Sequence, residues 1–284
     1  MAMQPITLTS GMRANLVSLQ QTNSMMEVTQ KRLSSGKKVN SALDDPVAYF
    51  TAQAHEQRAG DLASRKDEMS EAVQLVKAAN TGIESLKTLI AAAKSLASSA
   101  LSADTTAAAN SLATQYTTIL NQINFMADDS GYKGVNLLKE GSSTVKFDET
   151  GVESKLELIG FDATSTGLSL AGGAATVGSA AGNWTSATAI STTAIDNAMA
   201  ALDSATTTLR TESSKLSNNL SIITARQEFT RGMINTLKDG AAELTNADMN
   251  EEGANMLMLQ TRQALGTTSL SLASQAAQSV LRLF

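Results

Sequence analysis

The sequence predicts a mainly α-helical protein, a long antiparallel coiled-coil or helical-bundle rod with a small β-hairpin region and with its two termini paired at one end. Three observations predict this fold class. Apolar residues alternate at spacings of three and four over long stretches of both halves of the chain, which is the pattern of a coiled-coil seam. The period changes to two only in a short central stretch. Aromatic residues make up 4% of the 284 residues, which suits narrow helix–helix seams better than a thick enzyme core.

The first helix is expected within residues 1–43. Apolar residues recur there every seven positions: Met12, Leu19, Met26 and Leu33. Gly36 suits the turn that ends a helix. Asp45 is a good N-cap residue, and Pro46 is tolerated at the first helical position, so a second helix is expected to begin there.

The strongest periodicity lies between residues 46 and 101. The predicted seam consists of Leu62, Met69, Ala72, Val76, Ala79, Ile83, Leu86, Ile90, Ala93, Ala97 and Ala100. Its alanine-rich second half lets helices approach closely. A break is expected around residues 102–104, where Asp104 is expected to cap the next helix. That helix has a second seam of the same period, which consists of Ala109, Leu112, Tyr116, Ile119, Ile123 and Met126.

The centre of the chain differs from the helical halves. Apolar and polar residues alternate in 144–147 and 155–159, which predicts a β-hairpin within 132–161. In 161–194, 26 of the 34 residues are Ser, Thr, Gly or Ala, and Asp162 is the only charge. This stretch is either a small irregular insertion or a flexible surface loop.

The helical pattern returns at about residue 195. The returning seam consists of Ile195, Ala198, Leu202, Ala205, Leu209 and Leu216, and continues after a one-residue phase shift with Leu220, Ile223, Ile234, Leu237, Ala241 and Leu244. In the last segment Met258, Leu265 and Leu272 recur every seven residues. Helices from the two ends must pair, because each seam is too narrow to be stable alone.

Composition excludes several kinds of chemistry. Without cysteine there is no disulfide or thiolate metal site, and a single histidine, His55, excludes any multi-histidine metal site. His55-Glu56 does not begin a zinc motif, because the second histidine position is occupied by Ala59. Asp44 and Asp45 resemble a carboxylate pair but are better explained as capping residues. No Gly-rich phosphate loop is present, so neither an enzyme nor a cofactor is expected.

Charge and hydropathy restrict the kinds of partner that can be expected. A net charge of −5 gives no electrostatic reason to bind nucleic acid or an anionic membrane. No stretch is apolar enough to span a bilayer cheaply. The first thirteen residues lack the charged start and apolar run of a cleaved secretory signal. If the protein leaves the cell, we therefore expect it to do so without a standard secretory signal.

Three groups of residues carry a family resemblance. The first runs through Asn15-Leu16, Leu19-Gln20 and Thr29-Gln30 to Arg32-Leu33-Ser34-Ser35-Gly36 and Asn40-Ser41-Ala42, and ends at Asp44-Asp45-Pro46. The second is Gly131-Tyr132-Lys133-Gly134-Val135 within 125–138. The third comprises Ala247-Asp248-Met249, Glu251, Gln260, Leu265-Gly266, Leu272-Ala273, Gln275 and 278–283. Over roughly 1–160 and 195–284 the chain resembles the bacterial flagellins, in a short form with a minimal outer domain.

The resemblance implies a structural subunit that polymerises into the helical flagellar filament used for swimming. It implies an extracellular protein that leaves through the flagellar type III export apparatus, with an export chaperone, the hook–filament junction proteins and the filament cap protein as further partners. Two alternatives stay open: a hook–filament junction protein, and a secreted coiled-coil protein that never polymerises.

The resemblance also divides the chain into parts. Residues 1–43 and 245–284 are the two halves of an inner filament-core domain. Residues 44–131, the hairpin part 132–161 and the returning helix 195–244 form a rod domain. Residues 162–194 are an outer insert. Alignment places Ala92 and Gln115 where some flagellins carry an Arg and a Glu that a vertebrate Toll-like receptor binds, so weak or no activation of that receptor is expected.

Two sets of candidate site residues follow. The inter-subunit assembly set is Leu16, Leu19, Met26, Leu33, Met258, Leu265, Leu272, Val280 and Leu281, for which ordinary intramolecular core is the equal alternative. The candidate O-glycosylation set is Thr164, Ser165, Thr166, Ser169, Thr176, Ser179, Thr185 and Ser186, for which a solvated loop without sugar is the favoured alternative.

Overall fold

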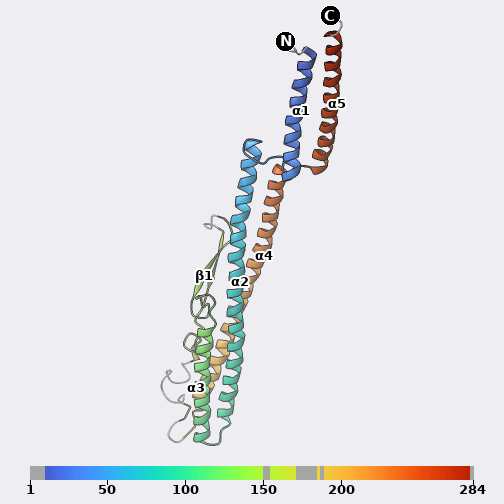
Figure 1. The fold of residues 1–284 in the computed structure, drawn as a ribbon. Helices are drawn as coiled ribbons and strands as arrows, with labels where there is room; N and C mark the ends of the chain where they lie inside the picture. The colour runs from blue at the N-terminus through green and yellow to red at the C-terminus, as the bar shows by residue number, and fades with distance from the viewer. Residues whose placement is uncertain (1–9, 150–153, 171–183, 186–188, 282–284) are drawn as a thin grey trace. The chain divides into compact units, whose positions relative to one another are not determined.

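The computed structural model describes residues 10–149, 154–170, 184–185 and 189–281. In chain order the elements are α1 (Ser10–Ser35), α2 (Pro46–Leu101), α3 (Thr106–Asp129), β1 (Ser142–Lys146), β2 (Lys155–Ile159), α4 (Thr192–Thr245) and α5 (Met249–Leu281) (Figure 1). The mainly α-helical class and its small hairpin are thereby confirmed. The chain forms two compact units, one of residues 60–234 and one of residues 1–59 with 235–284.

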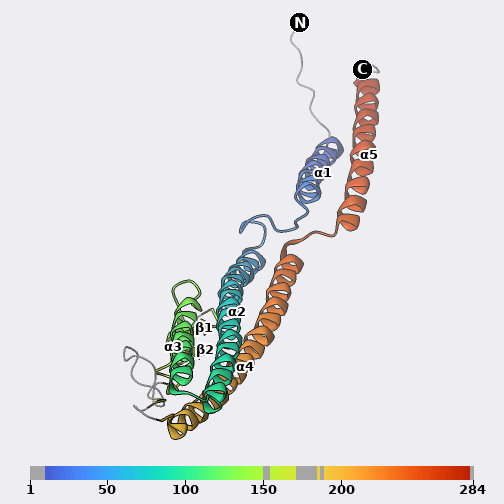
Figure 2. The ribbon, with the colours of Figure 1, turned by 90° about the horizontal axis from the view of Figure 1, so that it is seen from below.

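In the 60–234 unit, α2 and α4 run antiparallel. Every residue of the predicted α2 seam is buried, as are the predicted α4 residues from Ile195 to Leu216. Polar contacts tie the two helices at intervals: Lys94 pairs with Asp203, and the Ser213 hydroxyl donates to Asn80 Oδ1 at 2.8 Å. Both ribbon views place α3 and the hairpin alongside α2 (Figures 1 and 2).

The buried face of α3 departs from the predicted seam. Ala109, Tyr116 and Ile123 are buried as expected, but Leu112, Ile119 and Met126 are only half-buried. Their place is taken by Ala113, Leu120 and Ala127. The reason is a second neighbour: residues of the central insert pack on α3, which widens and rotates its buried face. The N-cap prediction was also wrong by one residue, since the Thr105 side chain, rather than Asp104, accepts from the Ala108 amide at 3.2 Å.

The hairpin pairs β1 with β2 antiparallel, from Ser142 opposite Ile159 to Lys146 opposite Lys155. Val145 and Leu158 are buried, while their strand neighbours are exposed or half-buried. The Arg226 guanidinium of α4 lies 5.2 Å from the ring centre of Phe147, just after β1. A cation over an aromatic face is attractive, so this contact helps to hold the hairpin to α4.

The other unit contains α1, α5 and the adjoining ends of α2 and α4. Asp45 caps α2 as predicted, because its Oδ1 accepts from the Val47 and Ala48 amides at 3.0 and 3.1 Å. Asp44 closes the preceding turn through Oδ2, which accepts from the Asn40 and Ser41 amides. These bonds lower the pKa of Asp44, the Asn40 amide having the largest effect. The capping interpretation of the two carboxylates is confirmed.

Candidate assembly surface

The surface is built on an antiparallel pair of helices, α1 and α5, which lie side by side in Figure 1. Their facing residues are buried or half-buried and follow a strict three–four spacing on each helix. On α1 they are Met12, Asn15, Leu19, Thr22, Met26, Thr29 and Leu33. On α5 they are Glu252, Met256, Leu259, Gln263, Gly266, Leu270 and Ala273. This is a coiled-coil seam with an unusually large polar share.

Three polar contacts cross the seam. Arg32 Nη1 donates to Glu252 Oε1 at 2.9 Å, and Gln263 Nε2 donates to Asn23 Oδ1 at 2.9 Å. Asn15 Nδ2 donates to Ser269 Oγ at 3.2 Å. Asn15 and Arg32 are seventeen positions apart, and so are their partners Ser269 and Glu252. The pairing of the two helices therefore keeps one register over this length.

The base of the pair is closed by backbone hydrogen bonds. The Lys38 amide donates to the Thr245 carbonyl at 2.7 Å, and the Ala247 amide donates to the Gly36 carbonyl at 2.9 Å. Gly36 has a φ of 69°, a left-handed conformation that glycine adopts without strain. Asp248 then caps α5 by accepting from the Asn250 amide at 2.8 Å.

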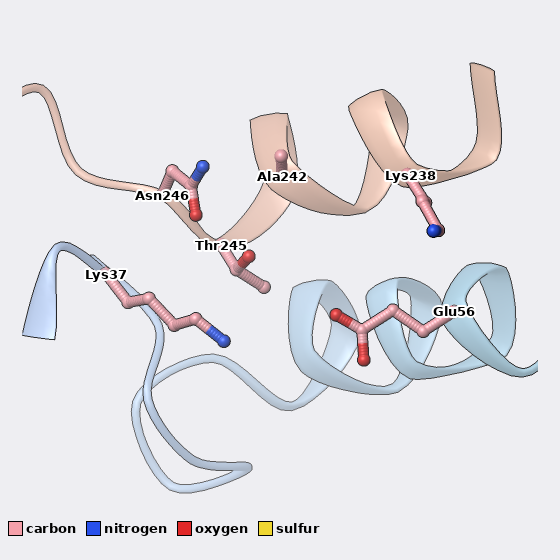
Figure 3. A pocket seen from close by; sticks show the side chains of 6 residues that line it. All are labelled: Lys37, Glu56, Lys238, Ala242, Thr245 and Asn246. Carbon is pink, nitrogen blue, oxygen red and sulfur yellow. The ribbon is translucent and has the colours of Figure 1, made fainter. Parts of the chain in front are cut away.

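A pocket of about 270 Å³ lies beside this base, between the α1–α2 loop, α2 and α4 (Figure 3). Lys37 and Glu56 point toward one another across it, and Lys238, Thr245 and Asn246 complete the lining (Figure 3). One carboxylate and two ammonium groups are no catalytic or metal-ligating set. Among the described residues, no group of three His, Asp or Glu side chains is placed to hold a metal ion. In the same part of the chain, no helix is long and apolar enough to cross a membrane.

The predicted assembly residues separate into two classes. Leu19, Met26 and Leu33 are half-buried in the seam. Leu16 is 40% exposed, and Met258, Leu265 and Leu272 are 53%, 67% and 62% exposed, so these four are not buried in the seam. The side chains of Val280 and Leu281 fall outside the described residues.

Sequence reasoning missed further apolar side chains on the same two helices. Val17, Met25, Val28 and Leu257 are also exposed. Met25, Val28 and Met258 line a groove of about 420 Å³ between α1 and α5. Met25 and Leu257 lie one position, and Val17 and Val28 two positions, from the predicted heptad residues. A search for apolar residues beside each heptad would have found them.

The candidate glycosylation residues also differ in accessibility. Thr166 and Ser169 are exposed, whereas Thr164 and Thr185 are half-buried. Ser165 is fully buried, and its amide donates to Asn124 Oδ1 at 2.8 Å, so a sugar cannot be attached there in the folded protein. Thr176, Ser179 and Ser186 lie outside the described residues. Ala163, Leu168, Leu170 and Trp184 join the core, so the described part of the insert is an irregular insertion packed on the helices.

The comparisons with known proteins match both helical halves. Residues 8–143 match the bacterial flagellin N-terminal helical region, and residues 192–284 match the bacterial flagellin C-terminal helical region. The chain belongs to the bacterial flagellin family. Flagellin FljM of Caulobacter vibrioides is 28% identical to it over 288 residues, which cover the whole of both chains. A flagellin of Brucella melitensis is 27% identical over 289 residues, covering 99% of each chain.

This flagellin is therefore a structural subunit that polymerises into the filament of the bacterial flagellum, outside the cell, and is not an enzyme. The alternatives of a junction protein or a non-polymerising coiled coil are not favoured. The structure adds where, on the α1–α5 pair, this subunit carries unburied apolar surface.

Proposed function

We propose that the outward face of the α1–α5 pair is the surface through which subunits of this flagellin join. The observation that carries the proposal is the exposure of Met258, Leu265 and Leu272, a heptad stripe on α5 that is 53–67% exposed in the single chain. Burying one such side chain fully contributes about 1.5–3 kcal/mol. A contiguous apolar stripe of this kind marks a partner surface.

Leu16 and the groove residues Met25 and Val28 extend the surface onto α1. A head-to-tail contact between different faces of identical chains generates a helical filament when its rotation does not close a ring. Leu19, Met26 and Leu33 are assigned to the intramolecular seam, since they already have α5 as a neighbour. Val280 and Leu281 remain predictions. With so polar a seam, the pair is expected to be labile in the free subunit and to become ordered on assembly.

The proposal fixes a role for each part of the chain. Residues 1–43 and 245–284 form the inner core of the filament, 44–161 with 195–244 form the rod, and 162–194 faces outward. The export apparatus, the export chaperone, the junction proteins and the cap protein are proposed as partners through the family resemblance alone. Glycosylation is retained for Thr164, Thr166, Ser169 and Thr185, with an unmodified insert still favoured. Thr176, Ser179 and Ser186 stay predictions.

The surface around Ala92 and Gln115 bears on activation of the Toll-like receptor. Ala92 and Gln115 line a shallow groove between α2 and α3 together with Ser95, Leu96, Thr118 and Ile119. None of these side chains is charged, so the groove offers no charge-assisted hydrogen bond. We expect weak or no Toll-like receptor activation, and a reporter-cell response at ordinary flagellin doses would refute it.

Removal of residues 265–284 tests the assembly proposal. The truncated chain loses Leu265 and Leu272 and is expected to form no filaments after seeding, by electron microscopy, while circular dichroism shows that its remaining helices persist. Filaments formed by the truncated chain would refute the proposal.

A further inference from the structure

Helix α5 carries two competing apolar faces. The inward face contains Leu259 and Leu270 but also Glu252, Gln263 and Gly266. The outward face carries Met258, Leu265 and Leu272. Each outward residue precedes an inward one, so a rotation of α5 by about 100° about its axis would exchange the two faces.

At three heptad positions of α5 the outward stripe carries the larger apolar side chains. The outward stripe is apolar at all three heptad positions, whereas the inward positions one residue later are Leu259, Gly266 and Ala273. Turning the stripe toward α1 would bury larger side chains, and burial free energy follows apolar area. The remaining positions oppose the rotation, because it would replace Met256 and Leu270 in the seam by Asn255 and Ser269. It would also bring Glu251 and Arg262 toward α1.

The polar contacts across the seam oppose the rotation. Glu252 is only 7% exposed and has Arg32 as its partner at 2.9 Å. A carboxylate with so little access to water is costly without a partner, and rotation would separate it from Arg32. The same movement would break the bond between Asn23 and Gln263.

Gly266 adds a steric component. A Cβ atom placed on Gly266 would lie 2.7 Å from Leu19 Cδ2, so the side chain of Leu19 occupies the space that the glycine leaves. After rotation Leu19 would face the larger side chain of Leu265 and would have to move. The seam therefore fits one face of α5 by both charge and shape.

We propose that Arg32 and Glu252 are positioning residues that select which face of α5 packs on α1, and that they thereby keep the Met258–Leu265–Leu272 stripe available to a second copy of this chain. The availability of the stripe matters only if the proposed assembly surface is right. The selection of the face is a separate property of the α1–α5 pair and can be measured without filaments.

Disulfide cross-linking of the full chain measures the face directly, because the native sequence contains no cysteine. The Leu19→Cys, Gly266→Cys variant reports the observed face, and the Leu19→Cys, Leu265→Cys variant reports the rotated face. We expect the first pair to cross-link at least about tenfold faster than the second, a difference that corresponds to ~1.4 kcal/mol.

Three backgrounds then test the role of the ion pair. Arg32→Leu leaves Glu252 without its partner, and is expected to lower the cross-linking ratio about tenfold because an unpaired buried carboxylate favours rotation. Adding Glu252→Leu removes the carboxylate and is expected to restore the ratio. Glu252→Leu alone is the matched control and should leave the ratio high, because the Arg32 side chain is 39% exposed and can reach water.

If the ion pair only stabilised the α1–α5 pair in general, Arg32→Leu would lower the rates of both cross-links together. Adding Glu252→Leu would then not restore the ratio. Three results would overturn the proposal. They are a cross-linking ratio near one with Arg32 and Glu252 intact, a ratio that Arg32→Leu leaves unchanged, and a ratio that Glu252→Leu fails to restore in the Arg32→Leu background. Seeded filament formation by the unmodified chain is scored separately. Absence of filaments with a high cross-linking ratio would count against the assembly surface and not against the face selection.

Discussion

The rings of Tyr116 and Trp184 pack with their centroids 4.8 Å apart and their planes at 47°, although 68 positions separate the two residues in the chain. Both side chains are fully buried. Tyr116 lies in the middle of α3, and Trp184 lies in the Ser/Thr/Gly/Ala-rich insert. The contact therefore anchors the insert to the helices just before α4 begins.

Trp184 is expected to contribute strongly to the stability of the 60–234 unit. Trp184→Ala should lower the free energy of unfolding by about 3–5 kcal/mol, the usual cost of removing a buried aromatic side chain. Urea unfolding followed by circular dichroism measures the loss. Trp184→Phe is the matched control and should lose less, because it keeps a ring against Tyr116. Equal losses in the two variants would contradict the anchoring role.

The Tyr116 hydroxyl is buried without a hydrogen-bond partner among the described residues. Such a group costs free energy when it leaves water. We expect Tyr116→Phe to leave stability at pH 7 unchanged or to raise it by up to about 2 kcal/mol. A clear loss of stability, measured by the same unfolding transition, would show that the hydroxyl has a favourable role.

Burial raises the pKa of Tyr116 from 10.0 to about 12. The folded protein thus holds the phenol proton over a range in which the unfolded chain has released it, so stability is complete below pH 10 and falls between pH 10 and about 12. Unfolding across this range should show a steeper decline for the parent chain than for Tyr116→Phe. Parallel pH profiles would argue against a buried phenol.

The turn before α2 should loosen in acid. The pKa of Asp44 is lowered from its ordinary value of 3.8, chiefly by the Asn40 amide. A lowered pKa means that the contribution is present above about pH 4 and is lost as the pH falls below it. Hydrogen exchange should show protection of the Asn40 and Ser41 amides at pH 6, and little protection at pH 2 or in Asp44→Asn. Asp61→Asn, on the exposed face of α2, is the control and should leave both amides protected.

The mass of the subunit taken from native filaments decides the glycosylation question. With an unmodified insert favoured, intact-mass measurement should return the mass of the unmodified chain. A heavier subunit, with sugar mapped to Thr166 or Ser169, would establish the alternative. Sugar on Ser165 would contradict the described burial of that side chain.

The helical pattern predicted most of the fold because long heptads leave few alternatives. Eleven positions from Leu62 to Ala100 were assigned to one seam, and all are buried. The predicted seam of α3 was partly wrong, because the central insert also covers this helix and a single seam does not describe its buried face. The anchor at Trp184 could not be predicted, since one aromatic residue in a low-complexity stretch carries no period.

On the assembly surface, the heptad pattern predicted the apolar stripes but not which of them is buried. Leu19 and Leu265 both lie on heptads, yet the first packs in the seam and the second faces solvent. A heptad gives the spacing of a stripe but not the neighbour that covers it. That choice depends on the partner contacts of Arg32, Asn23 and Gly266, which only the paired helices reveal.

We propose that the exposed stripe on α5 joins one subunit to the next. Leu272→Glu places a charge in the stripe, and Ser271→Glu places the same charge on the neighbouring exposed position of the same helix. Sedimentation after seeding, checked by electron microscopy, should show that Leu272→Glu reduces filament mass at least about tenfold, since a carboxylate resists burial in an apolar contact, while Ser271→Glu polymerises nearly as well as the parent chain. Equal polymerisation of the two variants would contradict the claim.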